Sequence, residues 1–151
     1  MAAISIHSAS KRGAGSNRRM NTGIVRSNPP GMAFPGMSQA IRCGDWVTVS
    51  GQVALRDGQV VGIGDAAEQA RQCFANIEAA LMAADVTLGD VVNLRCYLVE
   101  RAAYGGYAAV KNALFADNPP CSTAVIISGL LLPDLLMEVE ATAYAPLPQQ
   151  G

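Results

Sequence analysis

Two glutamates in the C-terminal part of the chain have the residue type and spacing for acid–base chemistry. Glu138 and Glu140 lie in the otherwise apolar run 136–143, and a spacing of two residues puts both on one face of a strand. A partly buried carboxylate with a raised pKa can orient or protonate a water or a small nitrogen-containing substrate. Alternatively, both glutamates form ion pairs with Arg95 or Arg42 on a solvated or inter-subunit face. Of the two glutamates, Glu138 is our first candidate for a catalytic residue.

Three further residues have side chains or backbone groups that could contact a ligand. Cys121 follows Pro119 and Pro120 at a helix-to-strand corner, where it either begins the strand as an inert small residue or lines a pocket as a thiol. No basic neighbour in the sequence would favour the thiolate, so we do not predict a nucleophile there. Gly51 inside a strand pattern predicts a bulge or a close approach, and Ser50 with the Gly51 N–H could bind a ligand oxygen.

Several common site types are excluded by residue content. The chain has one histidine, His7, and four widely spaced cysteines without a C-x-x-C pair, so we predict no zinc site. A Ser-His-Asp triad, a Gly-x-Ser-x-Gly elbow, a P-loop and a dinucleotide glycine fingerprint are also missing from the sequence.

The composition bounds the class of protein and its partners. The 151 residues are 50% hydrophobic and only 15% charged, which predicts one domain with apolar surface buried in an oligomer. A net charge of −1 gives no electrostatic reason to bind nucleic acid or an anionic membrane. No apolar run reaches the roughly 18 residues of a membrane span, and the N-terminus lacks a secretory core. We therefore expect a cytoplasmic protein with reduced thiols.

Residue patterns along the chain predict an arm followed by one folded domain. Residues 8–19 are small, polar and basic, which predicts that residues 1–22 form a flexible N-terminal arm, and residues 23–151 form the domain. Alternatively, residues 3–6 of the arm add a short strand. The domain is expected to contain strands and helices in the order strands 38–43 and 46–53, helix 66–84, strand 91–99, helix 100–117, and strands 119–130 and 136–143. We predict that the last two strands form a hairpin.

The two helices differ in how strongly the sequence supports them. The first has Asp65 as a predicted N-cap and an apolar stripe formed by Ala70, Cys73, Phe74, Ile77, Leu81 and Ala84, with Gln69 facing elsewhere. The second is weakened by Gly105 and Gly106, by roughly 1 kcal/mol each relative to alanine. Its predicted anchors are Tyr104, Tyr107, Leu114 and Phe115.

This element order predicts an α+β, ferredoxin-like fold with a mixed sheet and two helices on one face. Strand 91–99 would turn Val92, Leu94, Cys96 and Leu98 to one face and Asn93, Arg95 and Tyr97 to the other. We expect the sheet face without helices to be apolar and to be covered by self-association.

At the level of motifs, residues 23–146 resemble the RidA family, also called YjgF or the endoribonuclease L-PSP family. The resemblance rests on the joint order of short motifs, which are Ser38-Gln39-Ala40, Val49-Ser50-Gly51-Gln52, Gln69 with Asn76 and Ile77, Asp90-Val91-Val92, Tyr97-Leu98, Pro119-Pro120 and Met137-Glu138-Val139-Glu140-Ala141. It implies a chorismate-mutase-like fold and a homotrimer with sites in the clefts between subunits. It also implies an enamine/imine deaminase that uses no metal or organic cofactor.

Within that resemblance, an Arg binds the substrate carboxylate, a Glu positions water and backbone groups at the Ser-Gly turn assist. Glu138, Ser50 and Gly51 match this pattern. Cys121 stands where the family has its Arg, and Met37 and Ala108 stand where it has a Tyr and an Asn. We therefore predict a more apolar pocket and weak or absent activity on small anionic imines, because lost hydrogen bonds to a charged group cost roughly 1.5–3 kcal/mol each.

Three functions follow from these residues. The first is an enamine/imine deaminase with an altered substrate range, with Glu138 as the catalytic residue and Ser50, Gly51, Cys121, Met37 and Ala108 as substrate-binding residues. The second is a non-catalytic trimer that binds a small metabolite or a partner protein. The third is thiol-dependent chaperone or redox behaviour through Cys121. A ribonuclease is the least favoured reading, because the chain lacks a basic groove and a histidine outside the arm.

Overall fold

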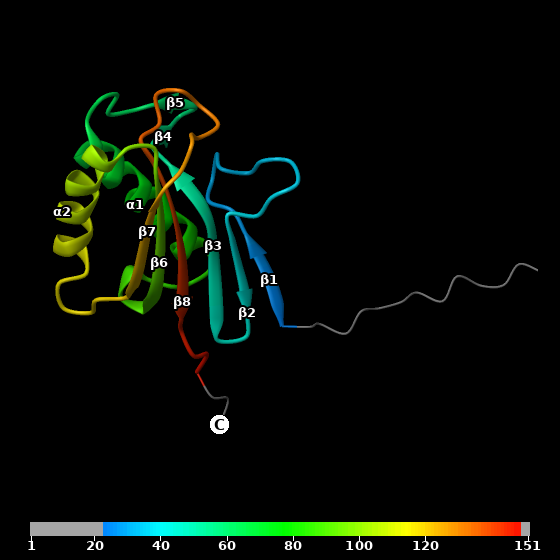
Figure 1. The fold of residues 1–151 in the computed structure, drawn as a ribbon. Coiled ribbons are helices and arrows are strands. Elements are labelled where there is room, and N and C mark those ends of the chain that lie inside the picture. The colour runs from blue at the N-terminus through cyan, green and yellow to red at the C-terminus, as the bar shows by residue number, and fades with distance from the viewer. Residues whose placement is uncertain (1–22, 149–151) are drawn as a thin grey trace, which may run out of the picture.

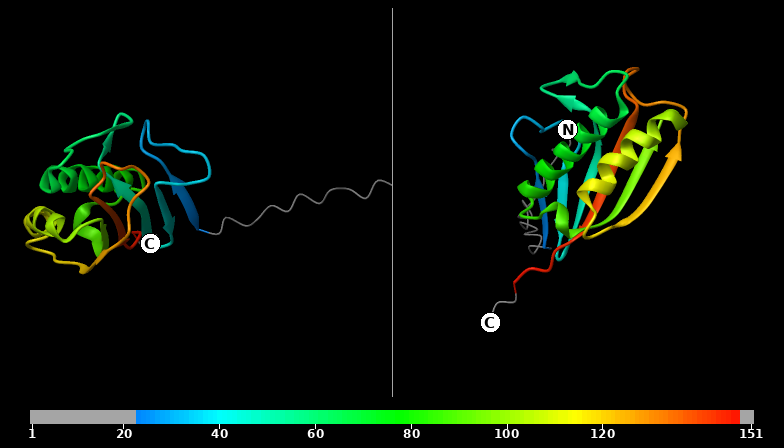
Figure 2. Two further views of the ribbon diagram at one scale, coloured as in Figure 1. Left: turned by 45° about the horizontal axis from the view of Figure 1, so that its top comes forward. Right: turned by 90° about the vertical axis from the view of Figure 1, so that its left-hand side faces the viewer.

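A six-stranded mixed sheet carries two helices on one of its faces in the computed structural model, which describes residues 23–148 (Figures 1 and 2). In spatial order the strands are β1 (Ile24–Ser27), β2 (Ala40–Cys43), β3 (Trp46–Val53), β8 (Met137–Tyr144), β6 (Val91–Leu98) and β7 (Cys121–Ile126). The helices are α1 (Ala66–Ala83) and α2 (Tyr104–Leu114), and a small hairpin joins β4 (Leu55–Arg56) to β5 (Gln59–Val60). This arrangement confirms the α+β class, whereas the predicted arm of residues 1–22 lies outside the described residues.

The predicted hairpin between the last two strands is wrong. β7 pairs in parallel with β6, while β8 lies on the other side of β6 and pairs antiparallel with both β6 and β3. The crossover through α2 places β7 beside β6, as connections between parallel strands do. The alternate residues Met137, Val139, Ala141 and Ala143 are all buried, so β8 takes a central place and the exposed β7 takes the edge.

Helix α1 begins and packs as predicted, with one exception. The Asp65 side chain accepts a hydrogen bond from the Glu68 N–H at 3.0 Å, and the predicted apolar stripe is buried. Gln69 was expected to face away from the core but is fully buried. Its amide nitrogen donates to the carbonyls of Gly62 and Asp134, and its amide oxygen accepts from the Leu136 N–H at 2.8 Å. Through these hydrogen bonds, Gln69 holds the segment 134–136, which leads into β8, against the first turns of α1.

Helix α2 is shorter than predicted and uses only two of its expected anchors. A 3-10 turn, Arg101–Ala103, precedes it, and it ends at Leu114. Tyr107 and Phe115 are buried against Phe74, whereas Tyr104 and Leu114 are exposed.

Gly106, which lowers the helix propensity of α2, has a packing role in the structure. A Cβ added there would lie 2.6 Å from the Ala67 nitrogen of α1, so the glycine allows the two helices to approach closely.

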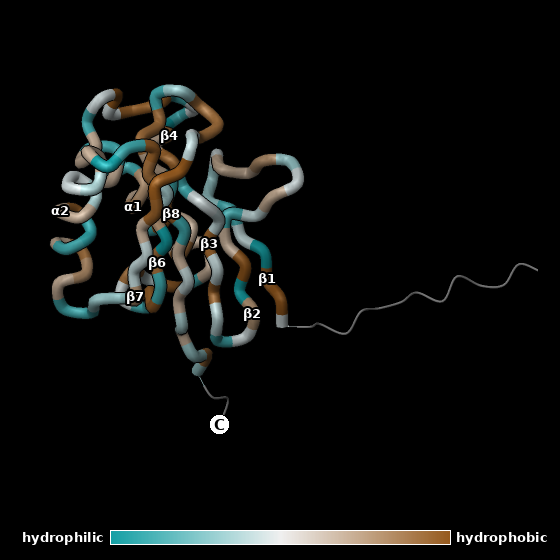
Figure 3. The backbone as a smooth tube through the Cα atoms, viewed as in Figure 1, coloured by the Kyte–Doolittle hydropathy of each residue, from teal (hydrophilic) through white to brown (hydrophobic). Residues whose placement is uncertain are grey.

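The sheet face without helices differs from the expected apolar surface. Its middle is polar, since Thr48, Glu138, Glu140 and Thr142 alternate with core residues on β3 and β8, and Asn93 and Arg95 do so on β6. A register shift between Val91 and Asn93 buries Val91 and leaves Val92 exposed, contrary to the simple alternation predicted for this strand. Exposed apolar residues occur instead at the ends and edges of the sheet, on the helices and in loops. One of these loops is the brown loop before β8, where Leu131 is 98% exposed (Figure 3).

Replacing Gln69 by alanine tests its role in holding the β8 connection. The change leaves two carbonyls and one N–H without a partner inside the protein, and we expect unfolding to become easier by about 2–4 kcal/mol, measured by urea denaturation. Gln72→Ala is the matched control, because Gln72 on the same helix bonds only to the Asn76 side chain. Equal losses in the two variants would contradict this role.

Candidate active site

The carboxylate of Glu138 lies directly on the backbone of Gly51. The β3–β8 register shifts between Val49 and Gln52, which is the bulge that the glycine predicted. A Cβ added at Gly51 would overlap Glu138 Oε1 and would lie 2.8 Å from its Cδ. The close approach that glycine permits at this position is therefore made by the candidate catalytic side chain.

Hydrogen bonds to the loop that precedes β2 hold this bulge in place. The Ser50 hydroxyl donates to the Ser38 carbonyl at 2.7 Å, and the Ser50 N–H donates to the Gln39 carbonyl at 2.9 Å. The Gln52 amide nitrogen donates to Gln39 Oε1 at 2.7 Å and to the Ser50 carbonyl at 2.9 Å. Gln39 and Gln52 are buried, and the sequence signals them only through the order of the motifs that contain them.

Glu138 is half-buried and has no ion-pair partner among residues 23–148. Burial raises the pKa of its carboxyl, and the negative charge of Glu140 on the same strand face raises it further. A carboxyl group tuned in this direction is better able to exchange a proton near neutral pH.

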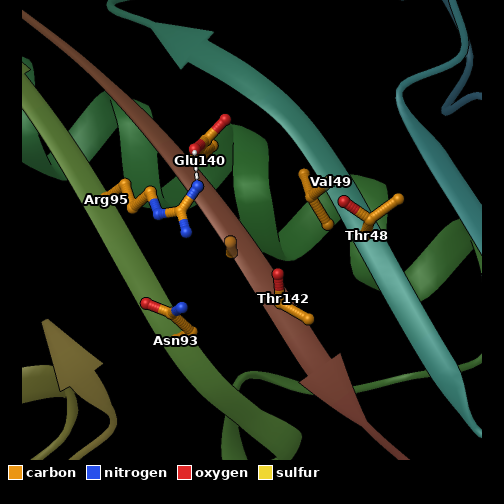
Figure 4. A pocket seen from close by; sticks show the side chains of 7 residues that line it. Thr48, Val49, Asn93, Arg95, Glu140 and Thr142 are labelled. Carbon is orange, nitrogen blue, oxygen red and sulfur yellow. Dashed lines mark ion pairs between the residues drawn. The ribbon is translucent and has the colours of Figure 1, made fainter.

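A second polar cluster, shown in Figure 4, includes Glu140, which lies two residues from Glu138 on the same face of β8. Arg95 Nη1 is 3.6 Å from Glu140 Oε1, and the Tyr97 hydroxyl donates to the same oxygen at 3.0 Å. The predicted ion pair with Arg95 is thus confirmed for Glu140. Arg42 does not contribute, because its guanidinium is buried and donates to the carbonyls of Ala84, Gly44 and Ala145.

The other predicted site residues fall into two groups. Met37 is exposed and directly precedes Ser38, whose carbonyl accepts from Ser50, so it lies near the bulge. Cys121 is exposed at the start of β7 opposite Asn93 of β6, whereas Glu138 pairs with Tyr97. Four residues of β6 separate these positions, or about 13 Å.

Ala108 also lies away from Glu138 within one chain. It belongs to α2, which covers the sheet face opposite the Glu138 carboxylate. One chain therefore brings together Glu138, Ser50, Gly51 and Met37, but neither Cys121 nor Ala108.

Residues 23–148 contain no group of three or more His, Cys, Asp or Glu side chains placed to hold a metal ion. No helix in the same residues has both the length and the apolar character needed to span a membrane.

Comparison with known proteins places the chain in a family. The family model described as Endoribonuclease L-PSP matches residues 31–145. The chain belongs to this family, which is the RidA/YjgF family. A RutC family protein of Pyrococcus horikoshii is 35% identical over 123 residues, which are 80% of this chain and 95% of that protein.

Solved RidA/YjgF structures share the fold. The crystal structure of Rv2704 from Mycobacterium tuberculosis, a member of the YjgF/YER057c/UK114 family, matches with a TM-score of 0.70 and 32% identity and covers 81% of this chain and 99% of that one. Among curated relatives, the 2-iminobutanoate/2-iminopropanoate deaminase of Escherichia coli K12 is 28% identical over 129 residues, which are 82% of this chain and 98% of the enzyme. Two yeast relatives are named mitochondrial Mmf1 proteins.

Replacing Gly51 by alanine tests the contact between the bulge and the carboxylate. The added methyl group must displace either Glu138 or the β3 backbone, so we expect a loss of about 1–3 kcal/mol in the free energy of unfolding. Gly129→Ala is the control, because a Cβ there meets nothing within 4 Å. If both substitutions cost the same, the close contact at Gly51 is not the cause.

The raised pKa of Glu138 makes a prediction about stability and pH. Because the folded chain holds this proton more tightly than the unfolded chain, the wild type loses stability as the pH rises from the ordinary value of 4.5 through the raised pKa. Glu138→Gln avoids this loss, since its amide stays neutral. We expect the variant's gain in melting temperature to be larger at about pH 7 than at about pH 4. A difference that is constant with pH would contradict the raised pKa.

Proposed function

We propose that the chain is a deaminase that hydrolyses enamines or imines and releases ammonia, with a substrate range different from that of the deaminase of E. coli. The observation that carries the proposal is the Glu138 carboxylate, which lies half-buried on the Gly51 backbone without a basic partner in residues 23–148 and with a raised pKa. The relationship to a 2-iminobutanoate/2-iminopropanoate deaminase supports this class of reaction.

In the proposed reaction, the residues at the bulge activate one water molecule. Glu138 accepts a proton from water as the oxygen attacks the C=N carbon of the protonated imine, giving a neutral tetrahedral carbinolamine. The same carboxyl then returns this proton to the nitrogen. The carboxylate formed in this way takes the proton of the carbinolamine hydroxyl as the C–N bond breaks, so that ammonia leaves and a C=O group forms. The balance is one imine and one water in, one ketone or keto acid and one ammonia out, with no cofactor required.

We further propose that the protein is a homotrimer whose sites lie between subunits. Cys121 and Ala108 lie far from Glu138 in one chain, so a neighbouring subunit would have to bring them to the same cleft. The exposed edge strand β7, which carries Cys121, is a suitable surface for such a contact. We also propose that residues 1–22 form a flexible arm and that residues 23–151 form a single domain. The proposed location of the protein is the cytoplasm.

Cys121 also bears on the proposed substrate. A thiol cannot donate the two charge-assisted hydrogen bonds with which a guanidinium holds a carboxylate. With Met37 and Ala108 as neighbours in the assembled cleft, we propose a larger or less anionic substrate than a small 2-imino acid.

A direct test uses imines generated in situ from several amino acids by an amino-acid oxidase. We expect the purified protein to accelerate ammonia release, most strongly for large apolar side chains, and Glu138→Gln to lower this acceleration by about a hundredfold or more. Glu78→Gln is the control, because Glu78 is exposed on α1. Release no faster than in buffer with every imine donor would rule the proposal out.

The alternative is a non-catalytic trimer that binds a small metabolite or a partner protein in the same cleft. It is favoured by Cys121, Met37 and Ala108, which stand at the family's Arg, Tyr and Asn positions. This alternative would be supported by a ligand that the wild-type protein binds without converting it to a product and that Glu138→Gln no longer binds. Formation of a product would exclude it.

A further inference from the structure

Two glutamine side chains are buried next to the Gly51 bulge. Gln39 and Gln52 are only 2% and 4% exposed, and this burial comes from their own chain, so it holds in a trimer as well. Gln52 pairs with Val139, whose side chain is in the core, so the Gln52 amide lies on the core side of β3. The interior of one subunit therefore supplies polar groups to the back of the bulge.

The Gln52 amide fixes the direction of a backbone carbonyl in the bulge. Its nitrogen donates to the Ser50 carbonyl at 2.9 Å and to Gln39 Oε1 at 2.7 Å. A carbonyl turned away from this donor would lose its partner in a place that water does not reach freely, which is unfavourable. The Ser50 carbonyl is therefore held toward Gln52 and Gln39.

The direction of this carbonyl determines the direction of the next N–H. The Ser50 N–H donates to the Gln39 carbonyl at 2.9 Å, so Ser50 turns both its backbone groups toward the segment before β2. The peptide bonds of residues 23–148 are all trans, and in a trans peptide the C=O and N–H point in opposite directions. The Gly51 N–H therefore points away from β2, toward β8.

The Glu138 carboxylate lies on that side of the bulge. Glu138 belongs to β8, and its Cδ would be 2.8 Å from a Cβ added at Gly51. The regular pairing of β3 with β8 is interrupted between Val49 and Gln52, so the Gly51 peptide is not fixed by the strand ladder. The Gln52 side chain takes over this task from the ladder.

The same hydrogen bonds reach the loop that carries Met37. The Gln39 amide nitrogen donates to the Met32 carbonyl at 3.0 Å, and the Gln39 N–H donates to Asn28 Oδ1 at 2.8 Å. Gln39 thus joins the loop on one side to Gln52 on the other. The loop and the bulge are held as one unit.

We propose that Gln52, supported by Gln39, is a positioning residue of the site, whose side-chain amide aims the Gly51 N–H at the atoms on which Glu138 acts. Its effect on catalysis rests on the proposed deaminase function, whereas the orientation of the peptide does not. A donor that is held in its working direction before the reaction can act on developing charge without reorganisation.

NMR with selective isotope labelling tests the orientation in the full chain. The sequence has two Ser-Gly pairs, Ser50-Gly51 and Ser128-Gly129, so labelling the serine carbonyl carbons and the glycine nitrogens gives two amide signals. We expect the Gly51 amide proton to shift when Glu138 is titrated between about pH 4 and about pH 8. Gly129, in the loop before β8, is the internal reference and should not follow this titration.

The source of the shift is checked by variants of the two glutamates. Glu138→Gln should remove the Gly51 response, and Glu140→Gln, which removes the neighbouring charge on β8, should retain it. Tyr97 on β6 and Cys73 on α1 are the other titratable groups near Glu138, and both have a raised pKa, so they stay protonated in this range.

Gln52→Met is the deciding variant, because it removes both hydrogen bonds with little change in side-chain volume. We expect the Gly51 amide to lose most of its response to Glu138 in this variant. Gln39→Met leaves the bond from Gln52 to Ser50 in place, so an intermediate loss is expected. It serves as the second variant if Gln52→Met fails to fold.

Gln69→Met is the matched control. Gln69 is also fully buried, and its amide nitrogen also donates to two acceptors, but these are the carbonyls of Gly62 and Asp134. This variant should lower stability and leave the Gly51 response at the wild-type level. A wild-type response in Gln52→Met and Gln39→Met, or an equal loss in Gln69→Met, would overturn the proposal.

Ammonia release measures the effect on catalysis separately. We expect Gln52→Met to lower kcat by about tenfold or more with little change in KM, as for a donor that acts in the transition state, and Gln69→Met to keep the wild-type kcat. An unchanged kcat in Gln52→Met would overturn the catalytic role. If the wild type releases no ammonia, the proposed function fails, and the Gly51 signal still decides whether Gln52 orients the peptide.

Discussion

The contact between the Glu138 carboxylate and the Gly51 backbone is the constraint on which the site depends. Any side chain larger than hydrogen at position 51 would occupy the space of the carboxylate. The Glu138 carboxylate can therefore take this position only because residue 51 is a glycine. Ser50, Gln39 and Gln52 hold the bulge by hydrogen bonds to one another and to the loop before β2. The carboxylate thus gains a rigid support while it loses solvent, and the loss of solvent is what raises its pKa.

Periodicity and motif order in the sequence predicted much of this protein, but not how its last strands pair. They located α1, β3 and β8, the bulge at Gly51 and the shared face of Glu138 and Glu140, because these follow from neighbours within a few residues. The place of β8 between β3 and β6 depends on contacts between segments far apart in the chain, which alternation alone does not specify. Gln69 was misplaced for a related reason, since its partners include Asp134 and Leu136.

The sheet has two faces with different chemistry. The face under α1 and α2 is apolar and closely packed, and the aromatic rings of Phe74, Tyr107 and Phe115 lie between the helices. The opposite face is polar in its middle, where hydroxyls, an amide and charged groups face away from the core. Substitutions on this second face can change its charge and hydrogen-bonding groups while the packing that holds the fold remains intact.

The central position of β8 has a consequence for how the protein folds. Strand β8 comes after all the other described strands in the chain yet fills the middle of the sheet, so β3 and β6 stay without their shared neighbour until residues 137–144 have emerged from the ribosome. Before that moment the nascent chain exposes two open strand edges and the apolar side of both. Completion of the sheet is therefore a late and non-local event, and a chain shortened before β8 would have no continuous sheet to form.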